Sequence, residues 1–300
     1  MASKIFPYNS GRSVMPTNLE LIKKSRDRFM AAIAAGDVNP AEGAFQGSVS
    51  AHDAETSVVV RFLSNRAQME AMLPPGKNLA IADPPVVTVV AVYQGGIKWL
   101  AGRTYNLFLV ILPVVHTGKA GKTSAGFLPV VWENMSEPIM LGREMLGWPK
   151  IYADLPPARK LSDTWQSIAA WNGFTFLDIN LTGIHVPTEA EFIKMAEDGK
   201  NAQASAGMLA HKFILKTGTL NFETDADYLT LSTNEGAPTP TVREVLIGKA
   251  GIRFNRGTWE QLPTMHHIIE KLAALEIKEV YDGIILTQTG GGMGVTRILE

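Results

Sequence analysis

The chain has 300 residues, 46% of them hydrophobic, with 28 basic and 29 acidic side chains and a net charge of −1. This even balance leaves no basic region of the kind that binds nucleic acid, so we expect no nucleic-acid partner. The lack of cysteine excludes disulfides, thiolate nucleophiles and cysteine metal ligands. The N-terminus has no signal-like apolar region, and the longest apolar runs are far shorter than the roughly 20 residues that cross a bilayer. We therefore expect a cytoplasmic protein with no membrane partner.

The first half of the chain begins with an expected helix and then changes to strands. Residues 1–50 are predicted to form an N-terminal helical extension, whose helix starts at Pro16 and stops at Gly36 because apolar residues recur there at helical spacing. From residue 51 the pattern favours strands at 57–63, 86–93, 99–115 and 126–132, with a short helix at 65–73. Residues 137–150 are expected to form a short helix followed by a sharp corner.

The second half continues with many short strands and few helices. Strands are predicted at 164–170, 173–181, 211–215, 228–232, 242–255 and 277–287, and helices at 189–200 and 266–275. Many strands at short spacing, with little alternation of strand and helix, favour antiparallel pairing. We therefore predict an α+β fold that is mostly antiparallel β, with curved sheets, a central closed β-barrel and peripheral helices, and with residues 51–300 as a single β-rich domain.

Metal and nucleotide motifs are weak in this sequence. None of the six histidines belongs to a His-Glu-x-x-His pair, so we predict no metal site. The glycine-rich stretch Gly290–Gly294 lacks the Lys-Ser/Thr of a phosphate-binding loop, and a flexible turn is the expected structure there. A Gly-x-Ser-x-Gly nucleophile motif is also lacking, which leaves a hydrolase of that type without support.

Lys150 is the remaining candidate for chemistry, because it follows a Gly-Trp-Pro corner in an apolar setting. A lysine attacks a carbonyl only as the neutral amine, and only about one lysine in 2,500 is neutral at pH 7. Bringing its pKa near 7 would cost the ammonium form roughly 4 to 5 kcal/mol, so the site would have to penalise charge. Trp148, Ile151 and Met145 are apolar neighbours that would do so, and Arg143 would add like-charge repulsion. The alternative is a solvated surface lysine, which is what most lysines after a proline are.

The surrounding motif resembles the acetoacetate decarboxylase-like superfamily. Glu137-Pro138-Ile139 followed by Gly142-Arg143-Glu144 matches its E-P-x-x-x-G-R-E segment, and Pro149-Lys150 follows at the family spacing, six residues after the last glutamate. In that superfamily the lysine forms a Schiff base with the substrate. The similarity extends more weakly from about Val58 to about Leu286. It implies that residues 51–300 form a cofactor-free catalytic domain and that the protein assembles as a homo-oligomer.

The resemblance also implies roles for individual residues. Lys150 would be the nucleophile and Glu144 the catalytic proton shuttle. The implied substrate-binding residues are Tyr105, Arg143, Trp148 and Leu107. For Glu144 an ion pair with Arg143 or a backbone cap is the structural alternative, for Arg143 a buttress of the turn, and for Tyr105 core packing.

Three positions depart from the decarboxylase pattern. Leu107 stands where the family carries its catalytic glutamate, Ile151 where a second lysine follows the nucleophile, and Glu55 where an arginine is expected to meet the substrate carboxylate. Arg61 or Arg103 is a candidate to replace that arginine.

These losses favour a lyase that performs aldol condensation and dehydration, or related carbon–carbon chemistry, on a small keto acid or aldehyde. The alternatives are a β-keto acid decarboxylase with altered acid groups and a non-catalytic barrel that binds small molecules.

Overall fold

The computed structural model describes residues 52–119, 121–202, 206–218, 223–237, 239–292 and 294–299. The predicted N-terminal helical extension, including the helix from Pro16 to Gly36, therefore lies outside the described residues. None of the helices in the described part of the chain is both long and apolar enough to span a membrane.

Fifteen strands of the described residues form one sheet, most of it antiparallel, as the sequence predicts. The strands are β1 (Ala54–Leu63), β2 (Leu79–Ile81), β3 (Val86–Ile97), β4 (Arg103–Gly118), β5 (Gly121–Glu133), β6 (Lys150–Tyr152), β7 (Arg159–Leu161), β8 (Thr164–Trp171), β9 (Phe174–His185), β10 (Met208–Leu215), β11 (Thr224–Ser232), β12 (Thr241–Phe254), β13 (Glu279–Val280), β14 (Gly283–Thr289) and β15 (Thr296–Leu299). Two pairings are parallel, and both involve β5, which is flanked by β10 and β6. Strand β5 therefore joins the antiparallel part of the sheet to β6, the strand that begins with Lys150.

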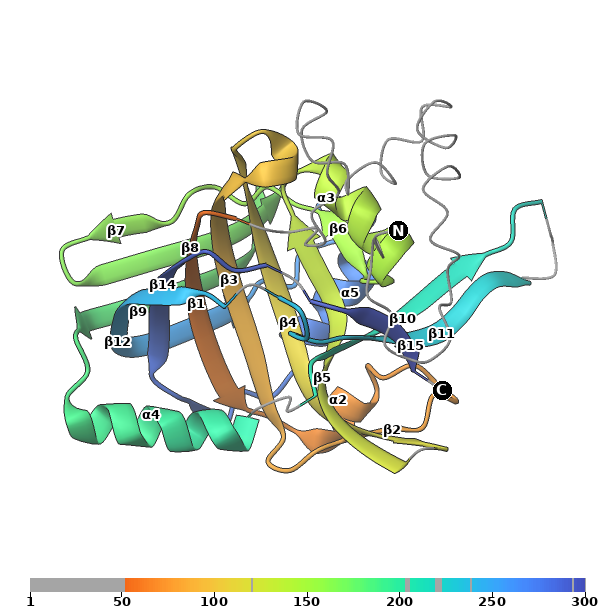
Figure 1. Ribbon diagram of the computed structural model, residues 1–300, viewed down its shortest axis with the longest axis horizontal. Helices are drawn as coiled ribbons and strands as arrows, with labels where there is room; N and C mark the ends of the chain where they lie inside the picture. The colour runs from red at the N-terminus through yellow and green to blue at the C-terminus, as the bar shows by residue number, and fades with distance from the viewer. Residues whose placement is uncertain are drawn as a thin grey trace.

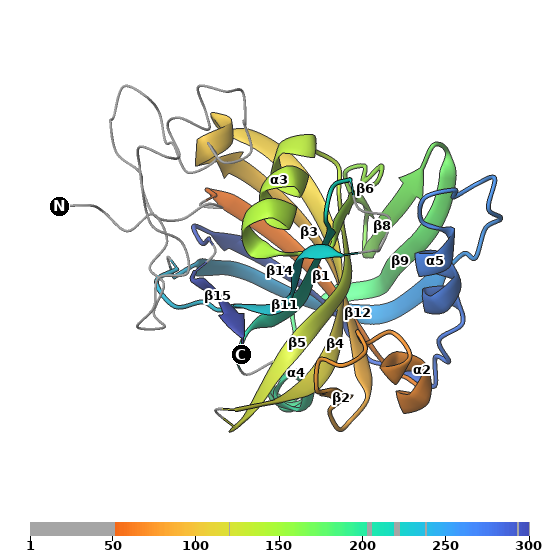
Figure 2. The ribbon, with the colours of Figure 1, turned by 90° about the vertical axis from the view of Figure 1, so that its right-hand side faces the viewer.

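The predicted closed barrel is wrong, because the sheet is open. Its path runs β15-β11-β10-β5-β4-β3-β1-β14-β12-β9-β8-β7, and no pairing among the described strands joins β15 to β7. The last strand, β7, has three residues, all exposed, and ends the sheet as a short edge. Figure 1 shows the strong curvature that the antiparallel pattern predicts, and Figure 2 shows the same sheet from the side. Curvature and alternation are local properties, whereas closure depends on whether the two end strands meet.

The described residues form four helices, which are α2 (Arg66–Glu70), α3 (Ser136–Leu141), α4 (Glu189–Ala202) and α5 (His266–Ala273). Short helical turns also occur at Lys98–Leu100, which is 3-10, and at Gly142–Leu146, which is π-helical and continues α3. Helices α3 and α5 lie on opposite sides of β4 and β5 (Figure 2). Helix α5 buries Ile269 and Leu272 in the main core, so the other side of the sheet remains available for the site.

The alternation of side chains along β4 separates two apolar clusters. Phe108 and Val110 belong to the large core, whereas Leu107 and Leu109 belong to a smaller cluster on the other face of the strand. This follows from the two-residue period of a strand, which sends successive side chains to opposite faces. The smaller cluster also contains Trp148. The face that carries this cluster is where the candidate site forms.

Candidate active site

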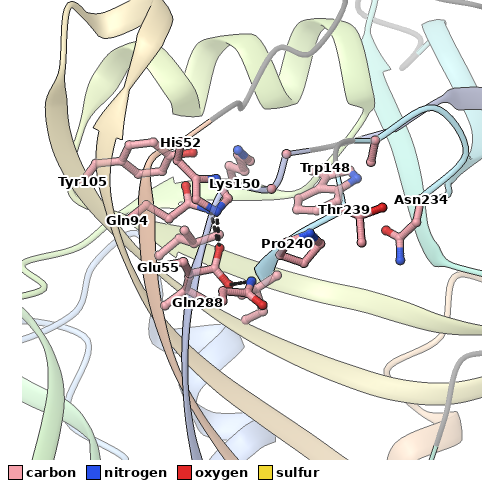
Figure 3. Close-up of a pocket in the computed structure, with 16 residues that line it drawn as sticks. His52, Glu55, Gln94, Tyr105, Trp148, Lys150, Asn234, Thr239, Pro240 and Gln288 are labelled. Atoms are coloured by element: carbon pink, nitrogen blue, oxygen red, sulfur yellow. Dashed lines mark hydrogen bonds and ion pairs between the residues drawn. The ribbon is translucent and has the colours of Figure 1, made fainter. Parts of the chain in front are cut away.

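A cavity of about 490 Å³ opens on this face of the sheet. Its lining residues are His52, Glu55, Val92, Gln94, Tyr105, Leu107, Leu109, Trp148, Lys150, Asn234, Ala237, Thr239, Pro240, Gln288, Gly291 and Gly292. Figure 3 shows one wall with Glu55, Gln94 and Tyr105 and a facing wall with Trp148 and Asn234. Apolar strand residues form much of the lining and a few polar groups converge on it, which is the composition expected of a small-molecule site.

Lys150 lines this cavity and is buried, with 6% of its surface exposed. It begins β6, which pairs in parallel with β5 so that Lys150 lies beside Val131. Its Nζ atom donates a hydrogen bond of 3.2 Å to the carbonyl oxygen of Pro138 in α3. The alternative of a solvated surface lysine does not describe this side chain. Lys150 is therefore buried in the wall of the cavity.

Glu133 is the acidic partner of Lys150. One of its carboxylate oxygens lies 2.7 Å from Lys150 Nζ, and the Glu133 side chain is fully buried. Burial raises the pKa of the Glu133 carboxyl, and the ammonium of Lys150 partly opposes that rise. Because burial favours the neutral carboxyl of Glu133, it lowers the free energy needed to move a proton from Lys150 Nζ to that carboxylate.

The sequence reasoning missed Glu133. Glu133 lies directly opposite Leu107 in the register between β4 and β5. A carboxylate is therefore present next to the position where the superfamily pattern places its glutamate, but it is on the adjacent strand. The signal in the sequence is a single glutamate directly after the apolar run of residues 127–132.

Trp148 and Gly142 fix the Lys150 side chain from two sides. The Trp148 ring centroid lies 5.4 Å from Lys150 Nζ, and the indole Nε1 donates to the hydroxyl of Ser232 at 3.1 Å. A Cβ atom on Gly142 would lie 2.3 Å from Cδ and Cε of Lys150, so only glycine leaves room for the lysine. The Gly-Trp-Pro corner is closed by a hydrogen bond from the Trp148 amide to the Gly142 carbonyl at 3.0 Å.

Tyr105 and Leu107 both line the cavity, as the sequence predicts for substrate-binding residues. Tyr105 is buried, and its pKa is raised well above the usual tyrosine value, first by burial and then by the charges of Glu133 and Glu55. Its phenol therefore stays protonated as a hydrogen-bond donor, in electrostatic contact with both carboxylates.

A row of polar residues crosses four strands beside Tyr105. In the strand register Gln288 on β14 is opposite Glu55 on β1, Glu55 is opposite Gln94 on β3, and Gln94 is opposite Tyr105 on β4. The amide groups of Gln94 and Gln288 each donate to Glu55 at 2.9 Å. Glu55 therefore holds a negative charge on the cavity wall, where the superfamily pattern would have an arginine.

Glu144 and Arg143 do not line the cavity, which corrects the predicted geometry. Both side chains are exposed, because the π-helical turn directs Gly142 and Leu146 inward and these two residues outward. The guanidinium of Arg143 donates to the main-chain oxygen of Lys150 at 3.1 Å. This contact buttresses the turn, which is the structural role given above as the alternative for Arg143. The main-chain oxygen of Glu144 accepts from Lys212 at 2.6 Å.

Neither arginine that was a candidate to replace the missing cation reaches the cavity. Arg61 is buried beside a separate cavity of about 210 Å³ that also contacts Lys194 and Asp282. Arg103 is exposed and donates to the main-chain oxygen of Leu100 at 3.1 Å.

Comparison with solved structures shows what this fold resembles. Acetoacetate decarboxylase from Legionella pneumophila subsp. pneumophila str. Philadelphia 1 is 17% identical, with a TM-score of 0.61 over 84% of this chain and 87% of that one. An acetoacetate decarboxylase-like enzyme from Sphingomonas wittichii RW1 is 16% identical, with a TM-score of 0.60 over 84% and 93%. At these identities the likeness concerns the fold alone.

A third similar structure is the enduracididine biosynthesis enzyme MppR, complexed with the condensation product of pyruvate and imidazole 4-carboxaldehyde. It is 14% identical, with a TM-score of 0.59 over 83% of this chain and 88% of that one. No curated protein matches the chain. The family model described as acetoacetate decarboxylase matches residues 39–290, which is most of the chain. The resemblance carried by the motif around Lys150 is thereby confirmed, and this chain belongs to the acetoacetate decarboxylase family.

Proposed function

We propose that this protein is a Schiff-base lyase, in which Lys150 forms an iminium with a small keto acid or other carbonyl substrate. The observation that carries the proposal is the buried pair of Lys150 and Glu133, with 2.7 Å between Nζ and a carboxylate oxygen. A buried ion pair is costly to desolvate and contributes little to stability, so a chemical role explains why it lies at a cavity. A merely binding protein would need neither the buried amine nor its acid.

Proton transfer within the pair starts the reaction. Glu133 takes a proton from the Lys150 ammonium, and the neutral amine adds to the substrate carbonyl carbon to give a carbinolamine. Protonated Glu133 returns its proton to the carbinolamine hydroxyl, which leaves as water while the nitrogen lone pair forms the iminium. The product is an iminium cation beside a carboxylate anion, so the charges of the original pair are restored.

The iminium then acidifies the carbon next to the former carbonyl. Loss of a proton from that carbon gives an enamine, which attacks the carbonyl carbon of an aldehyde. Elimination of water and hydrolysis of the iminium release an unsaturated carbonyl product and restore the amine. We assign the proton transfers to Glu133 instead of Glu144, because Glu133 contacts Nζ and Glu144 is exposed. Tyr105 would donate a hydrogen bond to the oxygen that leaves.

Condensation with dehydration is favoured over decarboxylation by three observations. Leu107 places an apolar side chain in the cavity where the family pattern has an acid, and MppR, whose fold is similar, was solved with a condensation product of pyruvate and an aldehyde. Glu55 also places a negative charge where a decarboxylase would hold the carboxylate of its substrate.

Reductive trapping tests the proposal. The protein is incubated with pyruvate, acetoacetate or hydroxyacetone and cyanoborohydride, and the modified peptide is identified by mass spectrometry. We expect a reduced adduct on Lys150 and none on Lys212, a lysine of the same region whose amine bonds to a main-chain carbonyl outside the cavity. If no carbonyl compound modifies Lys150, the nucleophile assignment fails.

A further inference from the structure

The cavity has a fixed anionic wall at Glu55. One carboxylate oxygen accepts from the Ser57 hydroxyl at 2.8 Å and from the Gln288 amide at 2.9 Å. The other accepts from the Gln94 amide at 2.9 Å and lies 3.3 Å from His52 Nε2. The side chain is only 13% exposed. Three hydrogen-bond donors, from β1, β3 and β14, therefore orient one carboxylate at the cavity surface, with His52 beside it.

Glu55 fixes the orientation of the two glutamine amides. A carboxylate can only accept, so the NH₂ group of each glutamine must face it and the amide oxygen must face away. The amide oxygen of Gln94 is buried and has no hydrogen-bond donor among the described residues. This oxygen is itself buried, so the acceptor that a ligand meets on this wall is the Glu55 carboxylate.

No lysine or arginine on the described cavity wall compensates for Glu55, whose ionisable neighbour is His52. Within the described lining, Lys150 is the only lysine or arginine, and Glu133 already balances its charge. The two candidate arginines, Arg61 and Arg103, lie elsewhere. A substrate carboxylate at this end of the cavity would meet the Glu55 charge with no guanidinium to receive it.

We propose that the cavity selects carbonyl compounds that carry a hydrogen-bond donor, neutral or cationic, on the side that faces Glu55, and that it excludes keto acids. Hydroxyketones and aminoketones, and the corresponding aldehydes, are the substrate class. The donor group lies in the field of Glu55. This inference rests on the proposed function. It narrows the proposed substrate, a keto acid or another carbonyl compound, to carbonyl compounds that are not keto acids.

Three matched ketones test this selectivity by cyanoborohydride trapping on Lys150. Pyruvate, hydroxyacetone and aminoacetone share an acetyl group and differ in the charge of the remaining substituent. Each trapping rate is divided by the rate for the same ketone with free Nα-acetyl-lysine, which removes intrinsic reactivity. We expect the normalised rates of hydroxyacetone and aminoacetone to exceed that of pyruvate by about tenfold or more, as expected for like charges in a partly buried site.

The Glu55→Gln variant removes the charge and keeps the shape. The normalised preference for hydroxyacetone over pyruvate is expected to fall by about tenfold in this variant. Glu279→Gln, which removes an exposed charge from β13, is the matched control and leaves the preference unchanged. Normalised rates that are equal for pyruvate and hydroxyacetone, or a preference that Glu55→Gln does not alter, overturn the inference while leaving Schiff-base formation intact. If Glu55→Gln does not fold, the wild-type comparison alone decides.

A binding measurement without covalent chemistry separates this inference from the proposed function. Isobutyramide and isobutyrate have the same shape, differ in charge and cannot form a Schiff base, so ligand-observed NMR compares their affinities directly. Tighter binding of isobutyramide to the wild-type protein supports the charge selectivity even if no ketone is trapped, in which case only the nucleophile assignment fails. Equal binding, or tighter binding of isobutyrate, overturns the selectivity.

Discussion

Gly142 lies directly against the Lys150 side chain, so that a Cβ atom at Gly142 would be 2.3 Å from Cδ and Cε and 2.8 Å from Nζ. The backbone of Gly142 is not the constraint, because its φ of −63° and ψ of −38° are helical and suit any residue. The glycine is therefore required for the space that the lysine occupies.

Gly142→Ala is expected to displace the lysine amine without unfolding the turn. Alanine favours the helical backbone, so its effect falls on the position of Nζ relative to Glu133. We expect the rate of reductive trapping to fall by about 100-fold, the effect of a misplacement near 1 Å. Gly95→Ala is the control, because its Cβ would lie 3.5 Å from the nearest atom, in Thr104, which is an ordinary contact. Equal trapping rates in the two variants would contradict the role assigned to Gly142.

The Lys150 and Glu133 pair is expected to cost stability when one partner is removed alone. Lys150→Met leaves a fully buried carboxylate unpaired, so the free energy of unfolding should fall by about 3 to 5 kcal/mol. The double variant Lys150→Met/Glu133→Leu should recover most of that loss, because it leaves no buried charge. Urea denaturation of the two single variants and the double variant gives the coupling energy.

An exposed pair supplies the comparison for that cycle. Lys278 and Glu276 lie 3.7 Å apart with side chains 42% and 53% exposed. Lys278→Met should change the free energy of unfolding by less than about 1 kcal/mol, since solvent screens such pairs. If the free energy of unfolding falls as little for Lys150→Met as for Lys278→Met, the carboxylate of Glu133 finds solvent or another partner.

Much of the fold follows from local patterns. Asn65 was expected to begin a short helix, and it caps α2 by accepting from the amides of Ala67 and Gln68. The predicted helices at 189–200 and 266–275 correspond to α4 and α5, and the long apolar runs form β1, β3, β4 and β5. Such elements depend on neighbouring residues, so the sequence pattern is sufficient to locate them.

The elements that complete the site are not local. Strands β6 and β15 are only three and four residues long, and each exists because it pairs with a distant strand. The contact between Lys150 and Glu133 depends on the register of β4, β5 and β6, which no spacing along the chain reveals. The superfamily motif implies a catalytic role for Glu144, but the π-helical turn directs its side chain outward. Lys150 could be found because its motif is contiguous.

The raised pKa of Glu133 gives stability a definite pH dependence. A carboxyl whose pKa is higher in the folded chain holds its proton more tightly when folded. Its contribution to the free energy of unfolding is complete below the unfolded value, about 4.3, and is lost as pH rises through the folded pKa. We therefore expect the stability of the wild-type protein relative to Glu133→Gln to decline as pH rises from 4.

Urea midpoints of both proteins between pH 4 and pH 8 measure this difference. The Glu133→Gln variant is the reference for the wild-type protein, because the two proteins share every other titrating group. A wild-type advantage that grows with pH would show that the ammonium of Lys150, and not burial, decides the charge of Glu133.

The turn that carries Lys150 is held from behind by β10 and β11. The hydroxyl of Thr230 on β11 donates to the Leu146 carbonyl at 2.7 Å in a buried contact, and the amine of Lys212 on β10 donates to the Glu144 carbonyl at 2.6 Å. Thr230→Val keeps the shape of the side chain and leaves the Leu146 carbonyl without this donor. It should lower the free energy of unfolding by about 1 to 3 kcal/mol.

The same substitution should slow trapping on Lys150 beyond any loss of folded protein, because the turn then samples more positions. Trapping is measured at a temperature where the variant is fully folded by circular dichroism. Thr241→Val, at an exposed position of β12, is the matched control and should leave both stability and trapping unchanged. If Thr230→Val loses stability but traps ketones at the wild-type rate, then α3 and β5 alone position the lysine, and the contact from β11 stabilises the fold without shaping the site.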